Sequence, residues 1–292
     1  MTSQIKTVVL LGLLSAIIIY MGGLMGGRSG VILAFGLALA MNVGSYWFSD
    51  KIVLSMYRAR ELAREEAPLL HQIVEELAQN AGIPLPRVCI VPEQAPNAFA
   101  TGRNPGHAVV AVTEGLLRLL PPEELRGVLA HEIGHIKNRD ILIQTIAGVM
   151  ASAIMTLANI LQFSAIFGGR DDEGRGNPLA ALALAFLAPL AAGLIQMGIS
   201  RSREYLADDT GAELCGEPLA LAGALARLAQ ASGRLPMQAG SPCTEQMFIV
   251  TPVFAFSGGI SRLFSTHPPI EERIARLQAM SRRSHGGDDG NG

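Results

Sequence analysis

The sequence predicts a mainly helical membrane protein that carries a small antiparallel sheet in its water-exposed part. Hydrophobic residues make up 49% of the 292 residues and charged residues only 16%, against roughly a quarter in soluble proteins. The mean hydropathy is +0.33. Long uncharged runs alternate with stretches of ordinary polarity. We therefore expect about four membrane-spanning helices attached to a water-exposed α+β domain.

Four uncharged runs are each long enough to cross a bilayer core, which takes about 20 helical residues. They cover residues 7–27, 29–49, 141–169 and 176–200. Only Arg28 separates the first two. No cleavage site for a signal peptide is evident, so we interpret this pair as a retained helical hairpin. The second pair is rich in alanine, and its two segments either cross the membrane or pack against the protein.

Basic residues predict how these helices are oriented, because loops rich in lysine and arginine remain in the cytoplasm. They flank the N-terminal side of the first run, the end of the second, the start of the third and the end of the fourth. These residues are Lys6, Lys51, Arg58, Arg60, Arg64, Lys137, Arg139, Arg201 and Arg203. The pattern predicts a multi-pass membrane protein with its water-exposed parts in the cytoplasm. The net charge is −2, and we expect no nucleic-acid partner.

The stretch between the second and third runs predicts helices and short strands. Residues 56–81 show a helical pattern that is interrupted near Pro68 and ends at Gly82. Short runs typical of strands follow at 87–91, 97–101 and 108–112. The segment 96–101 is the expected edge of this sheet. Such an edge can hold an extended peptide through main-chain hydrogen bonds, or it can simply shield the helices.

The most specific motif is His131-Glu132-Ile133-Gly134-His135. Pro121 and the acidic residues after it favour a helix that contains the motif. Residues four apart on a helix lie about 40° apart, so both imidazoles can bind one metal ion while Glu132 takes a proton from water. The pattern is typical of zinc proteases, although a surface helix can carry two histidines by chance. The three cysteines lack the spacing of a thiolate zinc site.

A catalytic zinc site needs a third protein ligand. Glu204 and Asp208 share one face of a predicted helix. Glu204 would bind the metal, and Asp208 would hydrogen-bond a ligand histidine and fix its tautomer. Spacing alone leaves other candidates open, namely Asp209, Glu213, His107 and His267. Small residues beside the histidine face would let a second helix approach closely; they are Gly127, Ala130 and Gly134.

Together these segments resemble the HtpX family of bacterial membrane-bound zinc endopeptidases, which are related to CaaX prenyl proteases and OMA-type proteases. The resemblance rests on the histidine motif and on Ser202-Arg203-Glu204-Tyr205-Leu206-Ala207-Asp208. It extends upstream to residues 97–102 and downstream to residues 264–269 with Arg273. With the placement of the hydrophobic runs, it spans nearly the whole chain.

The resemblance implies an α+β gluzincin-like metalloprotease domain with one zinc ion per subunit. The implied zinc ligands are His131, His135 and Glu204, and Glu132 is the implied catalytic acid and base. His267 and Asn97 are candidates for contacts with the oxyanion or the substrate.

The resemblance also implies the substrates: misfolded or damaged membrane proteins and unfolded polypeptides, cleaved at the cytoplasmic face during stress.

Asp140 is the last charge before the third run, and Glu204 follows the fourth by four residues. The metal is therefore expected beside the lipid bilayer. Processing of lipidated peptide tails, cleavage inside the membrane and a non-catalytic scaffold are the alternatives. Charged residues flanking the motif disfavour the second, and the intact Glu132 disfavours the third. The sequence leaves the oligomeric state open.

The expected organisation has five parts. Residues 1–50 form the transmembrane hairpin, and 51–140 hold the sheet and the histidine motif. Residues 141–200 form the second hydrophobic pair, and 201–283 supply the third ligand. The tail, 284–292, is expected to be disordered because it is rich in glycine and aspartate.

Overall fold

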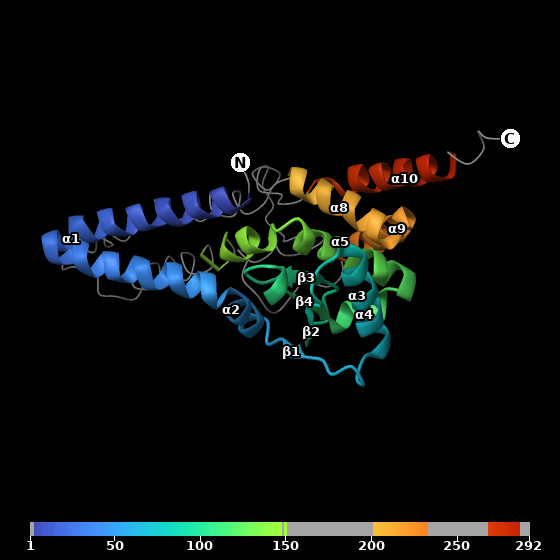
Figure 1. Cartoon of the computed structure of the whole chain (residues 1–292), viewed down its shortest axis with the longest axis horizontal. Helices are drawn as coiled ribbons and strands as arrows, with labels where there is room; N and C mark the ends of the chain where they lie inside the picture. Colours follow the sequence, from blue (N-terminus) through green and yellow to red (C-terminus); the bar gives the residue numbers. More distant parts are fainter. Residues whose placement is uncertain (1–2, 148, 151–200, 233–267, 287–292) are drawn as a thin grey trace, which may run out of the picture.

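The computed structural model describes residues 3–147, 149–150, 201–232 and 268–286. Most of the third hydrophobic run and all of the fourth lie outside these residues, as does His267. Mostly helices surround a small sheet in the described part of the chain (Figure 1).

Helix α1 (Ser3–Trp47) is the expected hairpin. It reverses direction at Gly27, which has a φ of 55°, a conformation that glycine adopts without steric cost. Its two arms run back along each other (Figure 1), and the amide of Asn42 donates a 2.7 Å hydrogen bond to the Ser15 hydroxyl across them. Among the described residues, only the segment Gly27–Trp47 is identified as long and apolar enough to cross a membrane. The expected number of four spans therefore stays a prediction.

Two further helices connect the hairpin to the sheet. Helix α2 (Ser49–Met56) follows α1 almost directly. Helix α3 (Pro68–Ala81) begins with the proline in its first turn and ends at Gly82, which has a φ of 67°. The predicted break near Pro68 is thus confirmed. The helical prediction for the residues just before it is wrong, because they form turns and the short strand β1 (Arg60–Glu61).

The sheet has four strands in the order β1-β2-β4-β3. The predicted strands correspond to β2 (Arg87–Val91), β3 (Ala98–Thr101) and β4 (Val109–Thr113). The prediction of an antiparallel sheet is wrong, because β2 and β4 pair in parallel while the other two pairs are antiparallel. The chain reverses before and after β3, so β4 runs in the direction of β2 and pairs beside it. This arrangement leaves β3 at the edge.

The central helix of the domain is α5 (Pro122–Lys137), which packs against α8 (Arg201–Cys215) and α9 (Pro218–Ser232). Helix α10 (Ile270–Gly286) packs on α9 and α8, and α4 (Glu114–Leu119) contacts β4. A 3-10 turn covers Pro105–His107. Helix α5 contacts the sheet as well as α3, α8 and α9. Helix α10 extends to Gly286, so the first three residues of the tail expected to be disordered are helical, and 287–292 lie outside the described residues.

Candidate active site

Helix α5 is buried along most of its length. Its apolar stripe, which includes Leu129 and Ile133, packs in the core of the domain. The side chains of His131, Glu132 and His135 on its other faces are also almost fully buried. Burial of three ionisable groups is costly unless they are paired or bind a metal. This disfavours a surface helix that carries two histidines by chance.

Helix α8 lies against the histidine face of α5 in very close contact. A Cβ atom added at Gly211 would lie 2.8 Å from the backbone nitrogen of His131, and one at Gly134 would lie 3.0 Å from the carbonyl oxygen of Ala207. Gly127, which was also named from the sequence, makes a similar approach to α9, at Leu221. The expectation that small residues admit a second helix is confirmed. Because Gly134 and Gly211 have no side chain, α8 lies close enough to α5 for an acidic residue of α8 to reach the histidines.

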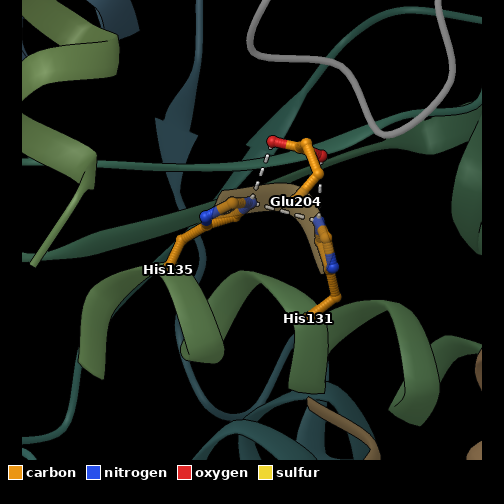
Figure 2. Close-up of side chains that lie close together, drawn as sticks. All are labelled: His131, His135 and Glu204. Atoms are coloured by element: carbon orange, nitrogen blue, oxygen red, sulfur yellow. Dashed lines mark hydrogen bonds and ion pairs between the residues drawn. The ribbon is translucent and has the colours of Figure 1, made fainter. Parts of the chain in front are cut away.

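That acid is Glu204, in the first turn of α8. The Nε2 atoms of His131 and His135 lie 3.1 Å apart. The two oxygens of Glu204 lie 3.8 Å from Nε2 of His131 and 3.7 Å from Nε2 of His135. Figure 2 shows the three side chains converging from α5 and α8. We call them the metal cluster, because one ligand atom from each lies within 4.8 Å of the others. No other such group occurs among the residues that the structure describes.

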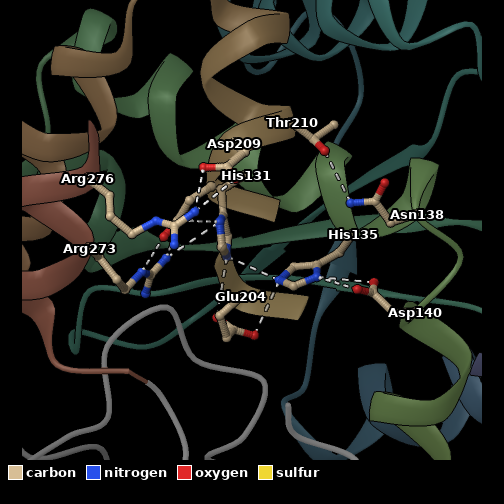
Figure 3. A network of polar contacts seen from close by, with 10 residues as sticks. His131, His135, Asn138, Asp140, Glu204, Asp209, Thr210, Arg273 and Arg276 are labelled. Carbon is tan, nitrogen blue, oxygen red and sulfur yellow. Dashed lines mark hydrogen bonds and ion pairs between the residues drawn. The ribbon is translucent and has the colours of Figure 1, made fainter. Parts of the chain in front are cut away.

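Each histidine is held through its other ring nitrogen. Nδ1 of His131 lies 2.9 Å from Oδ1 of Asp208, and Nδ1 of His135 lies 3.1 Å from Oδ1 of Asp140 (Figure 3). Because an ionised carboxylate only accepts hydrogen bonds, we assign the ring protons to Nδ1. The two Nε2 lone pairs then point at a common position beside Glu204. Such an arrangement is repulsive unless a cation occupies that position.

The sequence predicted the contact of Asp208 with a histidine ring but missed that of Asp140. Asp140 lies five residues beyond His135, too far for the same face of a continuous helix. The chain ends α5 and turns back at Arg139, which has a φ of 57°. The backbone N–H of Asp140 then donates to the carbonyl of His135 at 3.2 Å. This turn, which no residue pattern signals, places the carboxylate beside the ring.

A second missed residue is Arg273, noted from the sequence only as part of the downstream match. It comes from α10 and is completely buried. Its Nε and Nη2 atoms donate to the two oxygens of Asp208 at 2.8 and 2.7 Å. Burial alone would raise the pKa of Asp208, but the charge and hydrogen bonds of Arg273, with a smaller effect of His131, lower it to about 2. Asp208 is therefore ionised and can hold the His131 ring.

The buried charges around the metal cluster do not balance. Four carboxylates lie there, from Glu132, Asp140, Glu204 and Asp208, against two guanidinium groups, from Arg203 and Arg273. With neutral histidines and an ionised Glu132, two negative charges are left uncompensated. Burial lowers the pKa of His135, but the surrounding carboxylates outweigh that effect and raise it to about 10. A divalent cation at the common position would neutralise the excess negative charge and displace the proton from Nε2 of His135.

Glu132 points into the same region without belonging to the metal cluster. Burial raises its pKa to about 8, although a charged His135 ring and a hydrogen bond from the backbone N–H of Ala100 lower it. Ala100 lies on the edge strand β3. The carboxylate therefore sits between the metal cluster and the strand, with a pKa in the range of a group that exchanges protons near neutral pH.

Other candidates from the sequence lie elsewhere. Asp209 pairs with Arg276 on the surface, Glu213 is exposed, and His107 is exposed and bonded to Arg103. Asn97 is buried directly before β3, and its backbone N–H donates to the hydroxyl of Thr113. His267 lies outside the described residues. The structure thus selects Glu204 among the described alternatives for the third member of the metal cluster.

The chain is similar in sequence to a family of peptidases. The profile of peptidase family M48 matches residues 64–281. A protease HtpX homolog from Syntrophobacter fumaroxidans is 56% identical over 284 residues, which cover 96% of this chain and 100% of the relative. Another from Pyrococcus abyssi is 58% identical over 279 residues, covering 95% and 96%. The crystal structure of S. mikatae Ste24p matches 94% of this chain and 65% of its own, with 19% identity and a TM-score of 0.49. The range matched by the family profile contains the whole metal cluster.

Proposed function

The chain belongs to peptidase family M48 and is a membrane-bound metalloprotease, and we propose that it is a zinc endopeptidase that cleaves misfolded or damaged membrane proteins. The observation that carries this proposal is the convergence of the two Nε2 atoms and the Glu204 carboxylate on one position. We propose His131, His135 and Glu204 as the ligands of one zinc ion per chain. Two imidazoles and one carboxylate form a donor set known from catalytic zinc sites, which keep a fourth position open.

The proposed chemistry divides between the metal and Glu132. Zinc, when bound, polarises a peptide carbonyl and lowers the pKa of water. Glu132 accepts a proton from the attacking water at its carboxylate and returns it to the leaving amine, as a general base that becomes a general acid. The N–H of Ala100 orients this carboxylate. Asp208 and Asp140 keep the ring protons on Nδ1, so that each Nε2 stays available.

We propose that the substrate binds as an extended strand along β3, with Asn97 and His267 near it. The N–H of Thr113 donates to the carbonyl of Asn97, which makes these two residues a hydrogen-bonded pair across β3 and β4. Hydrogen-bonded pairs alternate along an antiparallel ladder, so the backbone groups of Ala98 and Ala100 face away from β4. The residues of β3 are buried. A substrate would therefore have to displace the groups that cover the edge.

The proposed setting is the cytoplasmic face of a bacterial inner membrane, in a multi-pass chain with the five parts expected from the sequence. The candidate span Gly27–Trp47 ends only two residues before α2, which contacts β3. The peptidase part is therefore tied closely to the bilayer. This short connection favours substrates that are themselves embedded in or bound to the membrane.

The proposal is tested by cleavage of casein with the purified full-length chain in detergent. Activity should disappear with a zinc chelator and return when zinc is added in slight excess. Restoration by magnesium but not by zinc would overturn the assignment of the metal. Unchanged activity of Glu132→Gln would overturn the assignment of the catalytic residue.

A further inference from the structure

A half-open cavity lies where the candidate membrane span meets the peptidase part. It has a volume of about 560 Å³ and is lined by the end of α1, the start of α2, and the two loops that contain Leu85 and His107. Its size suits a small ligand or a lipid headgroup. We propose that this cavity, the headgroup pocket, binds the phosphate of an anionic phospholipid. The proposal is independent of proteolysis.

Two cations of the headgroup pocket are not paired with carboxylates. The guanidinium carbon of Arg103 lies 4.8 Å from the ring centre of Trp47, and Nζ of Lys51 lies 5.7 Å from that of Phe48. Among the described residues, neither cation forms an ion pair with an acid at 4.0 Å or less. The third cation, Arg87, is already engaged by Asp50 at 2.7 Å. Two positive charges therefore remain for an anionic ligand.

The loop after β3 fixes the position of Arg103. Gly102 has a φ of 135°, and a Cβ atom there would lie 2.4 Å from the carbonyl oxygen of His107, so only glycine fits. The ring of His107 donates from Nδ1 to the Asn104 side chain at 2.9 Å. Its Nε2 therefore accepts from Arg103 at 2.6 Å. This neutral histidine orients the guanidinium and adds no competing charge, leaving other N–H groups of Arg103 for phosphate oxygens.

The rim of the pocket distinguishes a lipid from a free phosphate ion. Trp47, Phe48 and Leu85 line it, and each is about half exposed although it is large and apolar. Trp47 ends the candidate span. Tryptophan at the end of a span is typical of the membrane–water interface, where lysine and arginine meet the phosphates of anionic lipids. A soluble phosphate needs no apolar rim, whereas a lipid places its glycerol and first chain carbons there.

Trp47 is the single tryptophan of the chain and reports directly on this pocket. The full-length protein is reconstituted into phosphatidylcholine vesicles that contain increasing fractions of phosphatidylglycerol. Bromine on the acyl chains of one lipid or the other quenches the tryptophan fluorescence. We expect phosphatidylglycerol to be preferred beside Trp47 by roughly fivefold, which corresponds to about one basic contact. Equal quenching by the two brominated lipids would overturn the proposal.

Matched variants separate the pocket from general surface charge. Lys51→Gln with Arg103→Gln should abolish the preference, whereas Arg118→Gln with Arg282→Gln, which removes two charges from exposed sites outside the pocket, should retain it. An equal loss in both double variants would overturn the assignment to the pocket. Loss of the preference in millimolar inorganic phosphate at constant ionic strength would show that the site binds a free ion. That result would overturn the assignment of a phospholipid as the ligand.

Discussion

Arg273 donates hydrogen bonds to both carboxylate oxygens of Asp208, at 2.8 and 2.7 Å, and both residues are buried. The same carboxylate lies 2.9 Å from Nδ1 of His131. The C-terminal helix α10 is thereby connected to the metal cluster through a residue of α8. Because a buried carboxylate without a partner is strongly unfavourable, Arg273 is expected to act as a positioning residue.

Arg273→Met should lower the free energy of unfolding by about 3–5 kcal/mol, because it leaves the buried Asp208 carboxylate without a counter-charge. Zinc affinity should fall by roughly 10- to 100-fold, since Asp208 orients a proposed ligand. Thermal unfolding in detergent and competition with a chromophoric chelator measure the two effects. Arg276→Met, on the exposed side of the same helix, is the matched control. Equal behaviour of the two variants would show that the buried pair is dispensable.

Asp140→Asn should weaken zinc binding by roughly 10- to 100-fold. Asparagine keeps the shape and the backbone contacts of Asp140 but removes the charge that fixes the His135 ring. Asp209→Asn changes the same residue type in a surface ion pair and should leave zinc affinity unchanged. Chelator competition on both proteins makes the comparison. An unaltered affinity in Asp140→Asn would mean that the ring is held by something other than this carboxylate.

Glu132→Gln should retain zinc and lose casein cleavage by a factor of about 10² to 10⁴. The amide oxygen of glutamine can still accept the hydrogen bond from Ala100, but glutamine cannot carry the proton. Turnover and zinc content are measured on the same preparation. Glu123→Gln, exposed in the first turn of α5, should behave as wild type. Retention of more than a tenth of the activity by Glu132→Gln would contradict its proposed role.

Gly211→Ala should lower the free energy of unfolding by about 1–3 kcal/mol, because the added Cβ would lie 2.8 Å from the His131 nitrogen and force α5 and α8 apart. Zinc affinity should fall with it, since Glu204 lies on α8. Gly36→Ala, where a Cβ meets nothing within 4 Å, is the control for thermal unfolding. A Gly211→Ala protein as stable as the control would show that the two helices can separate without cost.

Local sequence patterns were sufficient to predict most residues of the metal cluster. The spacing of His131 and His135 and the small residues beside them follow directly from helical geometry. The choice of Glu204 over Asp209 or Glu213 needed either the family resemblance or the packing of α8. Helical spacing predicts only one of the two carboxylates that hold the histidine rings. Asp208 shares a helical face with Glu204, whereas Asp140 reaches His135 only through the left-handed turn at Arg139.

Long-range pairing accounts for the parts that the sequence did not predict. The strand runs of β2, β3 and β4 were recognisable, but their order in the sheet depends on which strands meet after folding. The parallel pairing of β2 with β4 was therefore not predicted. Arg273 lies 65 residues beyond Asp208, and no periodicity connects residues at that separation. Tertiary packing alone creates their contact.

The central claim, that Glu204 completes a metal site with the two histidines, is tested most directly by zinc content. Wild type, Glu204→Ala and Glu213→Ala are dialysed against a weak chelator, and zinc per chain is measured by mass spectrometry. Glu213 lies on the same helix but is exposed, so its variant controls for loss of an acid. We predict one zinc per chain in wild type and Glu213→Ala, and almost none in Glu204→Ala. One zinc per chain in folded Glu204→Ala would contradict the account.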